Sequence, residues 1–342
     1  MRRRPLAGRA LPVVLAGLTA MAALAGCSAQ APLPSQLAPV RLVPAGTRVI
    51  SQDEAATGRA APSVCADGSD PVASLAPAGP APAPTALPPG STMARIAQRG
   101  VLVVGVDQNT YPFGYRDPAT NTLAGFDVAV AKEMARAVLG DPERIRLRTE
   151  SSTQRIPNLL SGDVDLVVQT MTVTCERRRQ IEFSSVYYAA QQRVLVPKIS
   201  PARQLSDLGN RPVCSIEGST SVATLLAAPS RPTAVTVPEK NDCLVLLQQG
   251  QVDAISTDDT ILGGFAAEDP RTDVRGPGLA AEPYGIGVAP QNTDLVRFVN
   301  AVLERMRTDG TWARIYAATP TLNATGGTTV VPPGPPVARY RG

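Results

Sequence analysis

The sequence predicts an α/β protein, because short apolar strand patterns alternate with helical patterns through residues 92–320. Residues 101–106 and 166–169 have the apolar, β-branched content of interior strands. Residues 126–139 have apolar side chains at helical spacing, and Asp127 is expected as the N-cap of this helix. Strands connected by helices pair in parallel, so we expect mainly parallel sheets flanked by helices.

The remaining elements continue this alternation along the chain. A strand at 145–149 and a short helix at 156–160 complete the first half. The second half predicts strands at 211–216, 234–237, 252–256 and 285–289, and helices at 219–227, 243–249, 260–267 and 294–306. These roughly 230 residues are enough for two lobes.

Polar residues follow the apolar strand at 166–169 directly. Hydroxyls at Thr170, Thr172 and Thr174 are succeeded by Arg177. Strand ends are where α/β folds place their ligands, and a guanidinium with neighbouring hydroxyls suits a carboxylate. Arg178 and Arg179 are instead expected to lie solvated at the surface.

Residues 165–188 resemble the pattern T-x-T-x-E-R-x-x-x-[IV]-x-F-S-x-x-Y of polar-amino-acid solute-binding proteins, the extracytoplasmic receptors of ABC importers. Residues 124–128, Ala-Gly-Phe-Asp-Val, resemble the start of that family's first long helix, and the likeness extends from Gly100 to Tyr316. The resemblance implies a type II periplasmic-binding-protein fold joined by two hinge crossings. Lobe 1 would comprise residues 92–190 and 286–320, and lobe 2 residues 191–285.

The resemblance also implies how a zwitterionic amino acid would bind. Arg177 matches the carboxylate-binding position, with the Thr172 hydroxyl as an additional donor, and Asp258 matches the aspartate that receives the ammonium. Asp259 is then expected as the N-cap of the next helix, although these two roles can be exchanged. The remaining expected ligand contacts are Thr170, Thr220 in the Gly218-Ser219-Thr220-Ser221 loop, and Asp107. The alternatives are an ordinary helix N-cap for the loop and a turn-forming role for Asp107.

The side-chain pocket is less well defined by the sequence. The family often has a cation where this chain has Glu217, and Gln169 likewise offers an amide. Both departures favour glutamine or asparagine over a purely acidic ligand within the glutamine, glutamate, asparagine and aspartate class. Tyr111 is a candidate for stacking on the ligand, with core packing as the alternative.

The N-terminus predicts a lipoprotein. Arginines precede a short apolar run at 11–24, and Leu-Ala-Gly-Cys ending at Cys27 resembles a lipobox, so residues 1–26 read as a signal peptide. The run is short for a retained membrane-spanning helix. Acylated Cys27 would anchor the protein on the extracytoplasmic face of the cell membrane. Residues 27–91 are expected to form a Pro/Ala-rich linker, in which 42–50 can dock on the body, and residues 321–342 a disordered tail.

The cysteines agree with an oxidising compartment. Cys65, Cys175, Cys214 and Cys243 remain after lipidation of Cys27, and an even number permits three pairings. Cys214 and Cys243 fall within one predicted lobe, which leaves Cys65 to pair with Cys175. Buried reduced thiols are the alternative.

Composition excludes several classes of function. Removal of residues 1–26 takes away Arg2, Arg3, Arg4 and Arg9 and reduces the formal net charge from +4 to about zero, so nucleic-acid binding has no support. The chain contains no histidine, which disfavours a zinc site, and we expect no cofactor.

Three functional alternatives follow from the resemblance. The leading one is a monomeric receptor that delivers an amino acid to an ABC permease. A sensor that signals through a membrane protein would use the same lobes. An enzyme such as a cyclohexadienyl dehydratase or lytic transglycosylase would need an acid over its substrate, and we do not expect catalysis.

Overall fold

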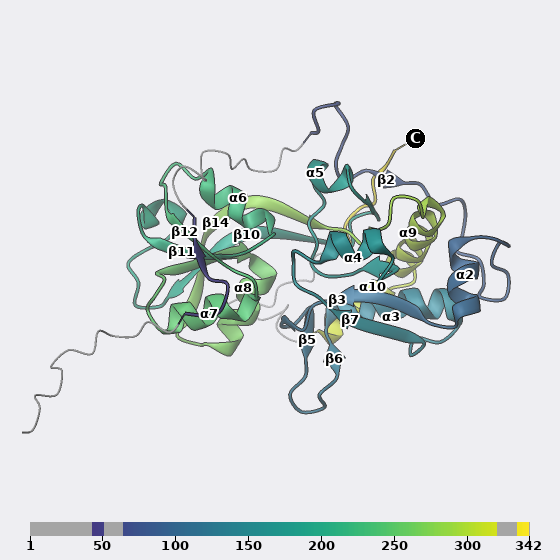
Figure 1. Ribbon diagram of the computed structural model, residues 1–342, viewed down its shortest axis with the longest axis horizontal. Coiled ribbons are helices and arrows are strands. Elements are labelled where there is room, and N and C mark those ends of the chain that lie inside the picture. Colours follow the sequence, from purple (N-terminus) through teal and green to yellow (C-terminus); the bar gives the residue numbers. More distant parts are fainter. Residues whose placement is uncertain (1–42, 51–63, 320–333, 342) are drawn as a thin grey trace, which may run out of the picture. The chain divides into compact units, whose positions relative to one another are not determined.

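Two sheets flanked by helices form two lobes in the computed structural model, which describes residues 43–50, 64–319 and 334–341 (Figure 1). The sheet of lobe 1 has the order β7-β3-β8-β15-β9, made from β3 (Leu102–Val106), β7 (Ile145–Thr149), β8 (Leu166–Val167), β9 (Glu182–Phe183) and β15 (Gly287–Val288). A small second sheet contains β4 (Asn109–Thr110), β5 (Gly114–Arg116) and β6 (Leu123–Ala124). The helices of this lobe are α2 (Thr92–Arg99), α3 (Phe126–Leu139), α4 (Arg155–Ser161), α5 (Cys175–Arg178), α9 (Thr293–Thr308) and α10 (Thr311–Ala318).

Lobe 2 is built on a six-stranded sheet. Its order is β1-β12-β11-β13-β10-β14, made from β1 (Arg48–Val49), β10 (Tyr188–Pro197), β11 (Pro212–Ile216), β12 (Thr233–Val237), β13 (Ala254–Asp258) and β14 (Thr272–Tyr284). The helical elements are the 3₁₀ helix η1 (Leu205–Leu208) with α6 (Thr220–Leu226), α7 (Lys240–Gln248) and α8 (Asp259–Glu268).

The strand pairings reflect the two crossings between the lobes. β3 pairs in parallel with β7 and β8, and β11 pairs in parallel with β12 and β13, as the βαβ order predicts. The long strands β10 and β14 connect the lobes and pair with each other antiparallel from Tyr188–Tyr284 to Pro197–Thr272. The predicted two-lobed fold of the type II class is therefore confirmed, with antiparallel strands where the chain crosses.

The first long helix has the predicted bounds but not the predicted cap. Gly125 occupies the N-cap position with φ 117°, and a Cβ there would lie 2.2 Å from the Phe113 carbonyl oxygen. Asp127 lies within α3 and is fully buried. Its carboxylate accepts hydrogen bonds from the Thr170 amide at 2.8 Å and the Tyr187 hydroxyl at 2.8 Å. The N-cap prediction is wrong because the Asp127 carboxylate binds groups of Thr170 and Tyr187, which are distant in the sequence, and does not cap an amide of its own helix.

Part of the predicted linker is docked on the body. Residues 64–91 lie against lobe 1, where the Ser74 hydroxyl donates to the Phe183 carbonyl and the Asn300 amide donates to the Leu75 carbonyl. Leu75, together with Ala81 and Leu87, packs against the lobe 1 core. The spacer prediction is thus wrong for 64–91, because hydrogen bonds and apolar contacts with lobe 1 hold these residues in place.

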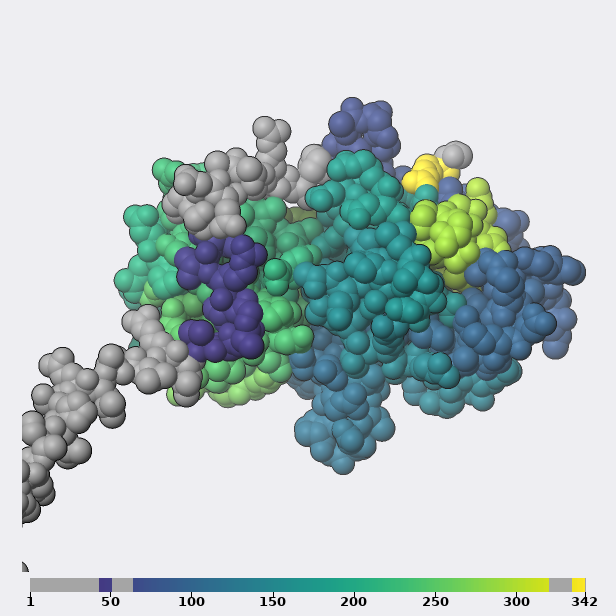
Figure 2. Space-filling model, in the orientation of Figure 1, coloured from purple at the N-terminus to yellow at the C-terminus, as the bar shows by residue number. Residues whose placement is uncertain are grey.

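Residues 43–50 also dock, in this case on lobe 2. β1 pairs antiparallel with β12, and these residues cover part of lobe 2 in purple in Figure 2. This agrees with the expectation that 42–50 can dock. The rest of the predicted linker, 27–42 and 51–63, and the predicted signal peptide with Cys27 lie outside the described residues.

The tail prediction is wrong for the residues 334–341. Tyr340–Arg341 form β16, which pairs in parallel with β2 (Ser74–Leu75). The Tyr340 hydroxyl donates to Glu304 at 2.7 Å and Arg341 forms an ion pair with Glu182 at 2.6 Å. These contacts with distant residues give no local signal in a Pro-rich and Gly-rich sequence.

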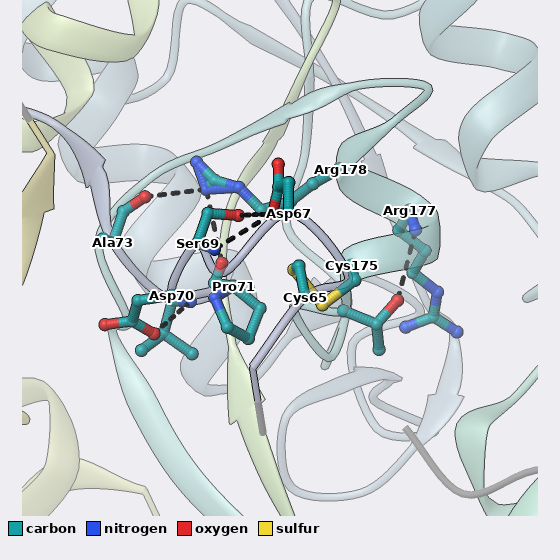
Figure 3. The surroundings of a disulfide bond; sticks show 11 residues. Cys65, Asp67, Ser69, Asp70, Pro71, Ala73, Cys175, Arg177 and Arg178 are labelled. Atoms are coloured by element: carbon teal, nitrogen blue, oxygen red, sulfur yellow. Dashed lines mark hydrogen bonds between the residues drawn. A yellow bond between two sulfur atoms is a disulfide. The ribbon is translucent and has the colours of Figure 1, made fainter. Parts of the chain in front are cut away.

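Both expected disulfides are present in the structure. Cys65 is bonded to Cys175, at the start of α5, and Cys214 is bonded to Cys243 within lobe 2. Figure 3 shows that the first bond places residues 65–73 beside α5, where the Arg178 guanidinium donates to the Ala73 carbonyl at 2.9 Å. Arg178 is therefore a largely buried structural residue, which corrects its predicted surface role, whereas Arg179 is exposed. Over the described residues, no helix has the length and apolar character needed to cross a membrane.

Candidate functional site

A small cavity lies between the lobes and contains five of the six ligand contacts expected from the sequence. Its volume is about 20 Å³, which is room for about one water molecule. Its lining residues are Ser152, Arg155, Thr170, Thr172 and Arg177 from lobe 1, and Ile216, Ser219, Thr220, Lys240, Thr257, Asp258 and Ile261 from lobe 2.

A larger cavity of about 730 Å³ opens beside it. The two cavities share Ser152, Arg155, Arg177, Ser219 and Thr220. Asp258 and Lys240 line only the small cavity, so the carboxylate-binding side of the expected site faces the larger opening.

Arg177 joins the two lobes. Its Nη1 donates to the Thr172 carbonyl at 2.7 Å and its Nη2 donates to the Gly218 carbonyl of lobe 2 at 3.0 Å. The Thr174 hydroxyl caps α5 by accepting from the Arg177 amide, which fixes the start of this side chain. Burial lowers the pKa of Arg177 from its usual value. A carboxylate would be a stronger acceptor for this guanidinium than the two carbonyls.

Asp258 is the buried acid of lobe 2. It occupies the N-cap position of α8, but its side chain caps no helix amide and instead accepts from the Tyr284 hydroxyl at 2.6 Å. Burial raises the pKa of Asp258 to about 8, and the neighbouring Glu282 adds to the rise. Asp259, the expected N-cap, is the first residue of α8, and its carboxylate accepts from the Gln191 amide.

Thr172 and Thr220 meet at a carboxylate that the sequence analysis missed. Both hydroxyls donate to Oε2 of Glu282, which lies on β14 and is 1% exposed. The Thr172 and Thr220 oxygens lie 3.5 Å apart. Burial raises the pKa of Glu282, and the two threonine hydrogen bonds oppose that rise.

Thr170 has an unusual backbone. Its φ is +40°, a left-handed conformation that a β-branched residue rarely adopts. The buried Asp127 carboxylate accepts from its amide and so holds this conformation. Asp127 thereby positions a cavity residue without lining the cavity, and burial raises the pKa of Asp127 to about 6.

Asp107 is engaged by a lysine of the other lobe. It forms a buried ion pair with Lys240, whose side chain is 6% exposed. Burial tends to raise the pKa of Asp107. The charge and hydrogen bond of Lys240, together with hydrogen bonds from the Asn109 amide and Gln169, outweigh burial, and the pKa lies below its usual value. Asp107 is the one expected ligand contact that does not line the small cavity; Lys240 does, and the sequence analysis missed Lys240.

Arg155 is the second cation that sequence reasoning missed. It is 3% exposed and donates to the carbonyls of Ser152, Gln169 and Gly218 at 2.9, 3.4 and 3.3 Å. Among the described residues it has no carboxylate partner within ion-pair distance. Burial and the charge of Arg177 lower the pKa of Arg155 to about 9. Its position directly before the short helix expected at 156–160 gave no indication of this burial.

The three residues considered for side-chain specificity do not line the small cavity. Gln169 is buried behind it and donates to the Glu150 carbonyl at 2.6 Å. Glu217 is about two-fifths exposed and faces Arg48. Tyr111 packs edge-on against Tyr115 beside a separate cavity. Among the described residues, no group of three or more acids and cysteines is placed to hold a metal ion.

Comparisons with known proteins identify the family of the chain. The family model of bacterial extracellular solute-binding proteins, family 3, matches residues 102–318. The ABC transporter glutamine-binding protein GlnH of Bacillus subtilis is 35% identical over 226 residues, which cover 66% of this chain and 83% of that protein. The glutamate-binding protein GluB of Corynebacterium glutamicum is 30% identical over 230 residues, covering 64% of this chain and 78% of that protein.

Solved structures share the fold. The solute receptor for L-cysteine of Neisseria gonorrhoeae is 29% identical with a TM-score of 0.65, covering 71% of this chain and 98% of that one. The match to the family model spans more than half of the chain and includes both lobes and both crossings. The chain is therefore a member of the bacterial extracellular solute-binding proteins, family 3, and a binding protein rather than an enzyme.

Proposed function

We propose that the protein captures glutamine or glutamate between its lobes and delivers it to an ABC importer. The observation that carries this proposal is that Arg177 and Asp258, one from each lobe, line a single cavity. Because this cavity holds only about one water molecule, a zwitterion would enter while the lobes are open, and would then pair its carboxylate with Arg177 and its ammonium with Asp258. Because the two partners lie on different lobes, binding would stabilise the closed form.

Arg155 supports a ligand whose side chain carries an oxygen. A buried guanidinium that donates only to carbonyls has donors suited to an amide or a carboxylate. Lys240 already neutralises Asp107, which makes a cationic ligand side chain less favourable there. The names of the Bacillus and Corynebacterium relatives agree with this class. We therefore add glutamate to the amide ligands that the sequence favoured.

Titration calorimetry of the unliganded protein tests the proposal. We expect micromolar binding of glutamine or glutamate, or of both, equivalent to about −8 kcal/mol. Arg177→Ala and Asp258→Ala should each cost about 2–5 kcal/mol, since each leaves a ligand charge unpaired. Arg179→Ala, an exposed neighbour, is the matched control and should bind normally. Arg155→Met should weaken glutamate more than glutamine.

Failure of all twenty amino acids to bind would contradict the proposal. Cells that lack the protein should take up less glutamine or glutamate if it serves import, whereas a sensor would leave this uptake unchanged.

For the location we propose attachment to the extracytoplasmic face of the membrane through lipidated Cys27, and for the oligomeric state a monomer. A Cys27→Ala variant should then leave the membrane fraction.

A further inference from the structure

Glu282 brings together one hydroxyl from each lobe at the expected ligand site. It lies on β14, one of the two crossing strands, and is almost completely buried. One of its oxygens accepts from Thr220 at 2.7 Å and also from Thr172. Thr220 is the first residue of α6 in lobe 2, whereas Thr172 follows β8 in lobe 1 and forms an isolated bridge with Tyr284.

These hydrogen bonds fix the chemistry of both hydroxyls. A threonine hydroxyl has one hydrogen and two lone pairs. Both hydrogens point to Glu282, so the hydroxyls can present only lone pairs to the small cavity that they line. A lone pair accepts from an ammonium group but repels a carboxylate oxygen. The sequence expectation that the Thr172 hydroxyl donates to the ligand carboxylate is therefore replaced by the opposite polarity.

Two acids lie at the cavity lining or directly behind it. Asp258 lines the cavity, and Glu282 lies directly behind the two hydroxyls. Arg155, Arg177 and Lys240 also line the cavity, but Lys240 is paired with Asp107 and Arg177 is expected to hold the ligand carboxylate. A ligand ammonium would favour the ionised form of Asp258, and would meet this carboxylate together with two hydroxyl oxygens whose protons are already engaged.

We propose that Glu282 is a positioning residue that makes the site selective for ligands with an α-ammonium group, by holding the Thr172 and Thr220 hydroxyls as acceptors. The inference rests on the proposed function and goes beyond it, because Glu282 acts through the threonines without touching the ligand. Both hydroxyls donate to the same oxygen, so glutamine could keep these hydrogen bonds through its amide oxygen. Methionine at this position removes the shared acceptor, and both hydroxyls can then turn their protons towards the cavity.

The test compares glutamine with its α-hydroxy analogue, which lacks the ammonium. Wild-type protein, Glu282→Met and the matched control Glu217→Met are titrated with both ligands. We expect Glu282→Met to weaken glutamine about 10-fold to 100-fold, and to change binding of the α-hydroxy analogue less than about 3-fold. Glu217→Met, which removes the same charge from a partly exposed position outside the small cavity, should resemble the wild type.

Two other results would overturn the inference. An equal loss for both ligands would make Glu282 a structural residue only, and an unchanged glutamine affinity would mean that the hydroxyls do not need it. Should Glu282→Met not fold, Thr172→Val and Thr220→Val provide the same comparison. We expect a selective loss of glutamine binding, and an equal loss of both ligands would contradict the inference. Absence of glutamine and glutamate binding in the wild type would instead remove the proposed function, and this inference with it.

Discussion

At the scale of single residues, Asp258 couples ligand binding to protons. Burial raises its pKa to about 8, so in the free protein this carboxyl is largely protonated at neutral pH. A raised acid pKa stabilises the folded state at low pH, and that stabilisation is lost as pH rises from about 4 towards about 8. A ligand ammonium favours the ionised carboxylate and reverses the shift.

Ligand binding should therefore release a proton from Asp258. At pH 6.5 we expect release of up to one proton per ligand, and an affinity that increases as pH rises towards 8. Calorimetry in two buffers with different ionisation enthalpies measures the number of protons. Asp258→Asn should abolish the release, whereas the buried Glu150, with a pKa of about 7 and no place in the cavity lining, provides a Glu150→Gln control. Release that persists in Asp258→Asn would assign the proton to another group.

At the scale of elements, the two disulfides should differ in their contribution to stability. Cys65 and Cys175 are 110 residues apart, and Cys214 and Cys243 are 29 apart. In the chain-entropy model the bonds contribute about 4.8 and about 3.6 kcal/mol, because a longer loop loses more freedom. Denaturant unfolding of the two double Cys→Ser variants should show the larger loss for Cys65→Ser with Cys175→Ser.

The first disulfide also holds a segment beside the site. Since residues 65–73 have further hydrogen bonds to Arg178, the measured loss includes any release of this segment. Lower stability after removal of the Cys214–Cys243 bond than after removal of the Cys65–Cys175 bond would contradict the loop-length argument. When all three proteins are measured in reducing agent, both variants should have the same free energy of unfolding as the wild type.

Prediction from sequence succeeded where local pattern determines structure. The helix at 126–139 was found with its exact bounds because its apolar spacing and flanking glycines are local signals. Docking of residues 64–91 was missed, since it depends on partners such as Asn300 and Arg297 that lie more than 200 residues away. Composition alone suggested a spacer there.

The candidate site divides in the same way. Arg177 and Asp258 were expected to line the cavity because they match positions in the sequence pattern of a known family. Arg155, Lys240 and Glu282 could not be predicted, because each begins a helix or lies within a strand and becomes part of the site only when the lobes meet.

At the scale of the whole molecule, the Lys240–Asp107 ion pair holds the lobes together. Both side chains are less than one-tenth exposed, so the pair is removed from water only when the lobes are closed. Lys240→Met would leave Asp107 buried and unpaired in the closed form, at a cost of about 3–5 kcal/mol. Opening the lobes returns Asp107 to water and avoids this cost.

We therefore expect Lys240→Met to open the unliganded protein. Small-angle scattering should show a larger radius of gyration for the variant, which saturating glutamine or glutamate should reduce. Lys132→Met is the matched control, because Lys132 pairs with Glu143 at the surface and should not affect opening. An unchanged radius of gyration in Lys240→Met would show that other contacts, such as the bond from Asn109 to Glu239, are sufficient for closure.

The pairing of β16 with β2 has a practical consequence for optical measurement. Tyr340–Arg341 are fixed to lobe 1 beside Ser74–Leu75, so a fluorescent protein fused to the C-terminus would report from lobe 1 alone. Val245 on α7 of lobe 2 is exposed and offers a position for a second dye. Energy transfer between the two labels would convert lobe closure into a colour change, and the receptor into a biosensor for its own ligand.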